Sequence, residues 1–327
     1  MTKQTVVTEK FLSFDGSRLS EGVTYNPSNH TLLWLDVIAG EIHRVFLPSE
    51  SLESYGSEDL IKVAETHEII KTGSPVGVIG LTSDDDVLIA GCKEGAGFAS
   101  FKTKTFEYKY LFETDPEVVK NMRSNDGSVD KDGNFWVGTM NDFSFGSVTP
   151  TGKLYKISAK DDSVTTMISE ATIPNGLGWF NGKMYWTDSL TFTIWKFDYD
   201  FTTGKLSNRE PHIKIKEILP GYDSPEPDGF CMTETGDIFT AVWSTSRVLH
   251  FNPAGELVEE FVFPAARISC VTFGGKDFDE LFVTSADLHL DEPELVGSVA
   301  GDLGGSIFRV KLPGVKGQKK NIWKGKI

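Results

Sequence analysis

Residues 131–138, Lys131-Asp132-Gly133-Asn134-Phe135-Trp136-Val137-Gly138, join a polar turn to a short apolar segment typical of a β-strand. Five other stretches of the chain share this design. The six apolar segments are Leu33-Trp34-Leu35-Asp36, Val87-Leu88-Ile89-Ala90, Phe135-Trp136-Val137-Gly138, Met184-Tyr185-Trp186-Thr187, Ile238-Phe239-Thr240-Ala241 and Leu281-Phe282-Val283-Thr284. With Leu33, Leu88, Trp136, Tyr185, Phe239 and Phe282 as markers, the intervals are 55, 48, 49, 54 and 43 residues.

This spacing predicts an all-β fold, a six-bladed β-propeller. A period of roughly 40 to 50 residues with several strands in each unit is typical of propeller blades. Helical solenoids have similar periods, but they need long helical stretches, and this chain offers a candidate only at 115–121. A β-sandwich of unrelated hairpins is the alternative, and it gives no reason for regular spacing. Because six units of about 50 residues fill the chain, we expect one domain over residues 1–327.

The composition restricts the location and partners of the protein. The chain has 327 residues and a net charge of −15, which argues against a nucleic-acid partner. The first residues lack the apolar core of a secretory signal, and no apolar run is long enough for a membrane span. Three cysteines, Cys92, Cys231 and Cys270, show no metal or redox spacing. We therefore expect a cytoplasmic protein, monomeric or a weak homodimer, with neither nucleic acid nor membrane as partner.

The sequence also predicts the structure of the segments at both ends of the chain. Residues Val6 to Phe14 and Gly305 to Lys311 have strand-like patterns, and we expect them in or next to the blade that closes the ring. The last stretch, Lys316 to Lys326, contains five lysines and no acidic residue. It is interpreted as a solvated tail, in which Trp323 packs back on the fold.

Four side chains with oxygen atoms occupy nearly the same position in their repeats. Glu21, Asn125, Asn175 and Asp228 precede their markers by 12, 11, 10 and 11 residues. In a propeller the innermost strand of each blade lines the central channel, so this shared position directs all four toward the axis. Two carboxylates and two amide oxygens suit Ca²⁺, and they also admit Mg²⁺ or Mn²⁺. Zn²⁺ would need an open site. Asn-Gly and Asp-Gly are also common turn dipeptides, so either interpretation stays open on spacing alone.

The same segments resemble a known family. The motifs, in chain order, are Glu21-Gly22, Arg123-Ser124-Asn125-Asp126-Gly127, Phe135-Trp136-Val137-Gly138-Thr139-Met140, Asn175-Gly176-Leu177, Tyr185-Trp186-Thr187-Asp188-Ser189, Pro227-Asp228-Gly229 and Cys270-Val271-Thr272-Phe273-Gly274-Gly275. In order and spacing they resemble the SMP-30/gluconolactonase family, also called the regucalcin family. Its members are six-bladed propellers that bind one divalent cation and hydrolyse sugar lactones.

The resemblance implies roles for individual residues. Glu21, Asn125, Asn175 and Asp228 would be the ligands of one divalent cation, with calcium expected first. Arg123 and Asn125 would contact the substrate, a small sugar lactone. Some relatives have an acidic substrate contact shortly after the Gly-Thr-Met segment, and Asp142 is the candidate at that place. The loop Asn141 to Thr151 is a candidate lid.

Opening a lactone requires a polarised carbonyl and an activated water, and a bound dication supplies both. Asp228 is the candidate general base. Arg123 would donate to sugar hydroxyls or to the developing oxyanion, with a salt bridge to a channel carboxylate as the alternative. No Gly-x-Ser-x-Gly motif is present, and Cys270 is interpreted as a buried apolar residue. Two other functions stay open: a calcium-dependent propeller esterase or organophosphatase, and a calcium-binding propeller without enzymatic activity.

Overall fold

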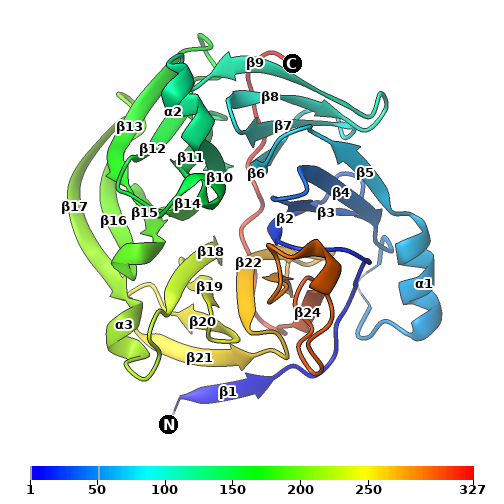
Figure 1. Ribbon diagram of the computed structural model, residues 1–327. Helices are drawn as coiled ribbons and strands as arrows, with labels where there is room; N and C mark the ends of the chain where they lie inside the picture. The colour runs from blue at the N-terminus through cyan, green and yellow to red at the C-terminus, as the bar shows by residue number, and fades with distance from the viewer. Residues whose placement is uncertain (1, 51) are drawn as a thin grey trace.

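The structure is a computed structural model that describes residues 2–50 and 52–327. Six sheets surround a common axis, as Figure 1 shows, so the predicted six-bladed propeller is confirmed. The first three sheets follow the chain in order. They consist of β2 (Ser20–Asn26), β3 (Thr31–Asp36), β4 (Glu41–Phe46) and β5 (Glu68–Lys71); β6 (Val76–Leu81), β7 (Val87–Cys92), β8 (Gly95–Ser100) and β9 (Thr105–Leu111); and β10 (Met122–Val129), β11 (Phe135–Asn141), β12 (Gly152–Ile157) and β13 (Val164–Ala171).

The other three sheets complete the ring. They consist of β14 (Pro174–Phe180), β15 (Lys183–Asp188), β16 (Thr193–Asp200) and β17 (Lys205–Lys214); β18 (Glu226–Met232), β19 (Ile238–Trp243), β20 (Arg247–Phe251) and β21 (Leu257–Val262), with β1 (Lys3–Val6) at its edge; and β22 (Arg267–Gly274), β23 (Glu280–Ala286) and β24 (Ile307–Lys311). That residues 1–327 form one domain stays a prediction.

Each apolar segment that predicted a blade lies in the second strand of its sheet: β3, β7, β11, β15, β19 and β23. These strands are buried on both faces because blades pack against each other face to face. Trp34, Trp136, Trp186 and Phe282 on them are at most 1% exposed. Burying such a side chain contributes roughly 1.5–3 kcal/mol, which explains why the strands carry a continuous apolar signal rather than an alternating one.

In residues 2–50 and 52–327, the helices that connect or flank the sheets are α1 (Ser57–Glu65), α2 (Pro116–Asn121) and α3 (Ile215–Ile218). The helix expected near 115–121 is present, and Asp115 caps it by accepting a hydrogen bond from the Glu117 backbone N–H at 3.0 Å. Three short 3-10 turns also occur: η1 (Phe143–Phe145), η2 (Ser189–Thr191) and η3 (Pro293–Leu295). In the described part of the chain, no helix has the length and apolar character needed to cross a membrane.

The N-terminal segment lies next to the closing blade, as expected, but it does not form the expected strand. A single strand over residues 6–14 is wrong: Lys3–Val6 pairs in parallel with β21 of the fifth sheet. The chain then crosses to the sixth sheet, where Leu12 and Ile307 form one isolated bridge. Phe11 and Leu12 are buried in the core between the blades, and backbone hydrogen bonds of 2.7–3.1 Å to Ile307 hold them beside β24 without a continuous ladder. The expected strand near 305–311 is confirmed as β24.

The interpretation of the C-terminal stretch as a solvated tail is also wrong. Residues 316–324, called the strap below, cross the middle of the ring, where Figure 1 shows them in red. The Gln318 N–H donates to the Met232 carbonyl at 2.8 Å, and the Trp323 N–H donates to the Leu81 carbonyl at 2.7 Å. Trp323 is 2% exposed, as its expected packing required. The strap therefore ties opposite blades together across one end of the channel.

Candidate functional site

Each innermost strand has a β-bulge near the same place, and four of these bulges carry candidate site residues. The pairing register shifts between Glu21 and Thr24, between Ser124 and Gly127, between Pro174 and Leu177, and between Pro227 and Phe230. A bulge inserts an extra residue and turns its side chain away from the regular alternation. Here it lets Asn125, Asn175 and Asp228 point along the channel while the strand stays in its blade.

Small residues allow the bulged strands to approach one another. A Cβ on Gly77 would lie 2.6 Å from the Asn125 backbone nitrogen, and a Cβ on Gly176 would lie 2.9 Å from the Asp228 carbonyl oxygen. Any larger residue at these positions would push the neighbouring blades apart. The glycines thus set the spacing of the oxygen-bearing side chains around the axis.

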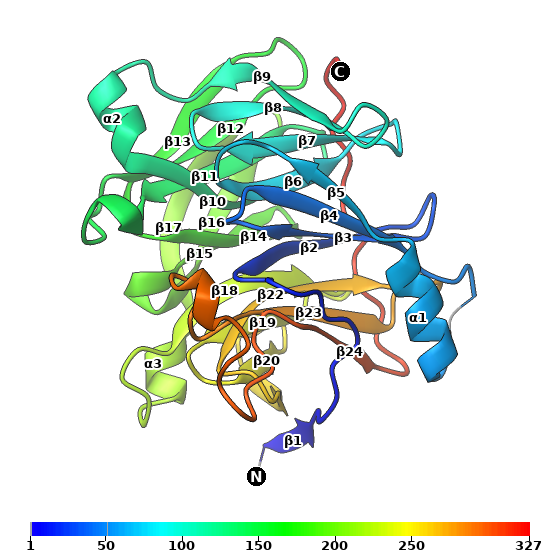
Figure 2. The ribbon, with the colours of Figure 1, turned by 45° about the vertical axis from the view of Figure 1, so that its right-hand side comes forward.

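The structure brings all six predicted site residues into the lining of one cavity of about 320 Å³. They are Glu21, Arg123, Asn125, Asp142, Asn175 and Asp228. In Figure 2 the loops that carry α2 and α3 lie at one end of the ring, and the strap lies at the other. The cavity opens at the first of these ends, where its wall includes Asp142 and Phe143 from the loop between β11 and β12 and Leu290 from the loop between β23 and β24.

Asn175 presents an oxygen that nothing in the described chain satisfies. Its amide Nδ2 donates to Ser189 Oγ at 3.1 Å, and Ser189 Oγ donates to the Pro227 carbonyl at 2.8 Å. Asn175 is 5% exposed, and its Oδ1 is buried without a hydrogen-bond partner. A buried acceptor left unpaired costs about 1–3 kcal/mol, so this oxygen is expected to meet a ligand.

Arg123 and Asn125 are joined directly. Arg123 Nη1 donates to Asn125 Oδ1 at 2.8 Å and to the Ser124 carbonyl at 2.8 Å. Asn125 Nδ2 in turn donates to the Pro174 carbonyl at 2.9 Å, which fixes the amide between two blades. No carboxylate lies within 4 Å of the Arg123 guanidinium in residues 2–50 and 52–327. The salt-bridge alternative for Arg123 therefore has no support.

The two predicted carboxylate ligands are buried together, and the charge of Arg123 offsets only part of the effect of burial on Glu21. Burial, and then the negative charge of Asp126, raise the pKa of Glu21 to about 8. Burial, followed by the charges of Glu21, Asp126 and Glu226, raises the pKa of Asp228 well above its usual range. Each carboxylate accepts one backbone hydrogen bond at 3.0 Å, Glu21 from Gly22 and Asp228 from Gly229. Two buried negative charges in one cavity are unfavourable unless protons or a cation neutralise them.

These donors fit a hard divalent cation. Among the described residues no cluster of three or more His, Cys, Asp and Glu side chains has a metal-binding arrangement. The candidate set instead combines two carboxylates with two amide groups, the ligand types that calcium accepts. The unpartnered Asn175 oxygen and the mutual repulsion of Glu21 and Asp228 are both features that a bound cation would relieve.

Asp142 lies in the cavity wall at the start of the loop Asn141 to Thr151. Its Oδ1 accepts from the Ser144 N–H at 3.0 Å and so begins the turn η1, while its Oδ2 lies 3.8 Å from Lys93 Nζ. Phe143 follows at the cavity rim, 58% exposed, with its ring centroid 6.0 Å from the Arg123 guanidinium carbon. The loop Asn141 to Thr151 thus contributes a carboxylate and an aromatic ring to the cavity.

The sequence interpretation missed part of the lining. Glu226, Trp243, Arg267, Leu290 and Asp291 also face the cavity. Burial raises the pKa of Glu226, which precedes Asp228 by two residues on the same strand. The sequence could have identified Glu226, because residues two apart on a strand lie on the same face as each other. Leu290 and Asp291 lie in a long connection without any repeat pattern, so no sequence signal pointed to them.

Asp126 does not belong to this cavity. It lines the channel below, together with Cys270. Its Oδ1 accepts from the Gly127 N–H at 2.6 Å, and burial raises its pKa to about 6. Burial also raises the pKa of the Cys270 thiol well above its usual range, so a nucleophilic thiolate is not favoured there.

Comparisons with known proteins agree with this architecture. The chain is 43% identical over 329 residues to the cell growth-regulated gene 1 protein of Candida albicans, covering 95% of each chain. It is 28% identical over 308 residues to regucalcin of Gallus gallus, covering 93% of this chain and 94% of the relative. Its fold matches a solved luciferin-regenerating enzyme with a TM-score of 0.76 and 27% identity, covering 98% and 99% of the two chains. Because the family model described as the SMP-30/gluconolactonase/LRE-like region matches residues 19–287, the chain belongs to that family.

Proposed function

We propose that this protein is a metal-dependent hydrolase that opens sugar lactones. The observation that supports it best is the single cavity in which Glu21 and Asp228 lie buried beside the unpartnered oxygen of Asn175 and the Arg123–Asn125 pair. Gluconolactonase is among the names of solved structures with this fold. A cytoplasmic location and a monomeric or weakly dimeric state remain part of the proposal.

Glu21, Asn175, Asp228 and, directly or through a water, Asn125 would hold one divalent cation, with calcium first and zinc, magnesium and manganese as alternatives. When bound, such a cation polarises the lactone carbonyl and makes a neighbouring water more acidic. It would also compensate the charge of two buried carboxylates, which otherwise repel each other.

The side chains of the protein would supply proton transfer and substrate binding. Asp228 accepts the proton of the attacking water, for which its Oδ2 is available since the Gly229 N–H bonds Oδ1. The water oxygen bonds to the carbonyl carbon, the ring C–O bond then breaks, and the released alkoxide takes a proton, giving a hydroxy acid. Arg123 and Asp142 would bind the hydroxyl groups of the sugar, and Arg123 would donate to the developing oxyanion.

The charges of the lining favour a neutral substrate. Five carboxyl groups (Glu21, Asp142, Glu226, Asp228 and Asp291) and two guanidinium groups (Arg123 and Arg267) face the cavity. A bound dication would bring the positive charge of the lining close to its negative charge. An additional phosphate or carboxylate on the lactone would then have no excess positive charge to pair with. We therefore propose an uncharged aldonolactone as the substrate class.

The test combines metal removal with a substrate panel. Protein treated with a chelator should lose turnover of glucono-1,5-lactone and regain it when calcium or zinc is added. The panel contains glucono-1,5-lactone, its 6-phosphate, an aryl ester and an organophosphate triester. Preference for the aryl ester or triester would favour the alternative propeller hydrolase. Stoichiometric calcium binding without turnover of any panel member would favour a calcium-binding protein without enzymatic activity, and would contradict the proposal.

A further inference from the structure

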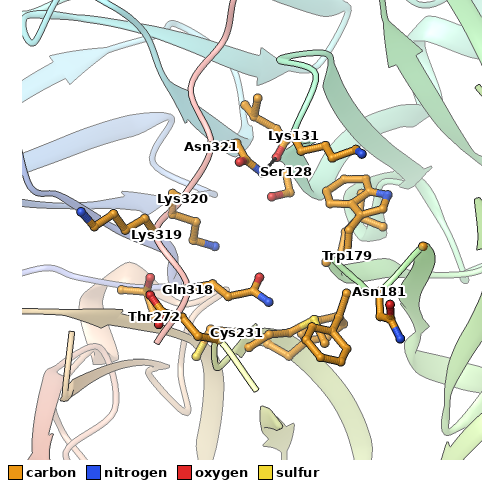
Figure 3. Close-up of a pocket in the computed structure, with 18 of the residues that line it drawn as sticks. Ser128, Lys131, Trp179, Asn181, Cys231, Thr272, Gln318, Lys319, Lys320 and Asn321 are labelled. Carbon is orange, nitrogen blue, oxygen red and sulfur yellow. Dashed lines mark hydrogen bonds between the residues drawn. The ribbon is translucent and has the colours of Figure 1, made fainter. Parts of the chain in front are cut away.

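A second cavity, of about 600 Å³, lies at the opposite end of the channel (Figure 3). It shares no lining residue with the candidate site. On β14 the candidate site uses Asn175, whereas the second cavity uses Trp179. Four residues of extended strand separate these positions, which corresponds to about 13 Å. The two cavities are therefore separate places for a ligand.

The strap makes one wall of this cavity, and hydrogen bonds hold it in place. Besides the backbone bond of Gln318 to Met232, Asn321 Nδ2 donates to the Val129 carbonyl at 3.0 Å. Trp323, buried beyond the cavity, anchors the end of the strap in the core. In Figure 3 the strap and its side chains lie on one side, and Trp179 and Asn181 lie on the other.

Three lysines line the cavity, and among the described residues Lys320 alone of the three has neither an ion pair nor a ring contact. Lys131 Nζ lies 3.5 Å from the centre of the Phe201 ring, and Lys319 Nζ lies 5.4 Å from the centre of the Phe278 ring. Lys320 has neither a carboxylate within 4 Å nor an aromatic ring beneath it in the part of the chain that the structure describes. At longer range its charge offsets part of the rise in the pKa of Asp126, which lines the channel beside it. In a chain with 47 acidic and 32 basic residues, an ammonium left unpaired beside a cavity is a position for an anionic group.

Two neutral polar groups accompany Lys320. The Gln318 amide and the Ser128 hydroxyl have no side-chain hydrogen bond within the described residues, and Figure 3 shows both turned toward the cavity. The rest of the wall combines the apolar side chains of Trp179, Phe180 and Met232 with polar ones, among them Glu234, whose carboxylate is paired with Lys316 at 3.1 Å. One cation and a few donors beside an aromatic surface are the usual composition of a small-molecule site.

We propose that this cavity binds a small organic acid with one carboxylate and a flat apolar body. The carboxylate pairs with Lys320 and accepts from Gln318 or Ser128, and the flat body lies against Trp179 and Phe180. One unpaired ammonium matches a single negative charge, and the overall charge of −15 disfavours a polyanion such as a nucleotide. This site does not depend on the proposed lactonase activity.

Isothermal titration calorimetry with two matched probes tests the proposal. Indole-3-acetate carries the carboxylate, and indole-3-acetamide has the same body without the charge. We expect indole-3-acetate to bind the full-length protein at least tenfold more tightly than the amide. Lys320→Gln should reduce the affinity for indole-3-acetate at least tenfold and leave the weak binding of the amide unchanged. Lys319→Gln is the matched control and should change neither affinity.

A second measurement locates the probe. In a protein labelled with ¹³C at the methionine methyl groups, indole-3-acetate should shift the Met232 signal, which lines this cavity, and not that of Met140 on β11. Absence of binding at millimolar probe, equal affinity for the two probes, an unchanged affinity in Lys320→Gln, or tighter binding of adenosine monophosphate would overturn the proposal. Asp228→Asn should bind indole-3-acetate normally, so failure of the lactonase proposal would leave this result unaffected.

Discussion

The side-chain amide of Asn175 donates to the hydroxyl of Ser189 across 3.1 Å, and that hydroxyl is itself committed to the Pro227 carbonyl at 2.8 Å. Because the only Ser189 proton is used by Pro227, Ser189 can only accept from Asn175. This relation determines which end of the Asn175 amide is nitrogen, and it leaves Oδ1 facing the cavity. Ser189 thus fixes the orientation of the Asn175 amide and leaves its oxygen for the proposed cation.

Ser189→Ala should weaken cation binding about tenfold, since loss of a partner that orients a ligand typically costs 10–100-fold in affinity. Calorimetric titration with calcium measures this. Ser285→Ala is the matched control, because Ser285 Oγ makes an equally buried bond of 2.8 Å to the Ser306 carbonyl in the last blade. Equal calcium affinities in the two variants would show that Ser189 only supports the fold.

Asp228→Asn separates the two roles proposed for Asp228. The amide keeps an oxygen for the cation but cannot accept a proton, so kcat for glucono-1,5-lactone should fall by about 10²–10⁴, the usual contribution of a general base. Calcium affinity should fall much less than after Asp228→Ala. Retention of wild-type kcat in Asp228→Asn would assign the base to another residue, with Glu226 the next carboxylate on that strand.

Arg123→Lys should reduce kcat/KM for the lactone by about tenfold to a hundredfold. Arg123 holds both Ser124 and Asn125 through Nη1 and carries two further nitrogens in the same plane. A lysine has a single nitrogen, so one of these bonds or the substrate contact is lost. Steady-state kinetics on glucono-1,5-lactone gives the ratio. If Arg123 only positions Asn125, calcium affinity and kcat/KM should fall together; a loss confined to kcat/KM supports direct contact with the substrate.

Much of the fold could be predicted because every blade buries both faces of its second strand. Trp34, Trp136 and Phe282 had to be apolar because both faces of their strands are covered, and this produced a regular signal. The shared position of Asn175 and Asp228 followed from the same repeat. The bulges that direct these side chains were not visible, since a register shift depends on the pairing between strands.

The remaining differences involve segments outside the repeat. Lys316 to Lys326 has the composition of a solvated tail, yet backbone hydrogen bonds and one buried tryptophan fix it across the channel. The N-terminal segment pairs with β21 because Thr5 and Lys3 both bond to Glu259, a contact between distant parts of the chain. Such individual contacts leave no periodic pattern in the sequence, so the structure of these two segments could not be predicted from composition.

His43 should make the stability of the protein depend on pH. Its ring stacks on Trp34, with the ring centroids 5.1 Å apart, and its Nδ1 lies 3.0 Å from His67 Nε2 in a hydrogen bond. Burial, followed by the nearby His67, lowers the pKa of His43 to about 3. Glu41 lies 3.5 Å from Nε2, but that nitrogen has no hydrogen bond, so burial dominates. A neutral His43 stabilises the fold above pH 6.5, and this contribution is lost as the pH falls from 6.5 toward 3.

The loss amounts to about 1.4 kcal/mol per pH unit for one proton. Urea unfolding at pH 7, 6, 5 and 4.5 should therefore show a steeper decline in the wild type than in His43→Phe, whose ring can stack but not titrate. Comparing slopes removes any constant effect of the substitution on stability. Titration of the His43 ring by NMR with a midpoint near 6.5 would contradict this expectation.

Trp323→Ala should destabilise the whole propeller and not only the strap. Its side chain is buried in the cluster that includes Phe135 and Tyr155 of the third blade, and its backbone bonds to Leu81 of the second. Removing a buried tryptophan typically costs about 3–5 kcal/mol. The adjacent Ile322 is 40% exposed, so Ile322→Ala should stay within about 0.5 kcal/mol of the wild type. Urea unfolding of both variants measures the difference. A small change in the free energy of unfolding of Trp323→Ala, combined with faster proteolysis at 316–322, would mean that the strap detaches while the ring stays closed.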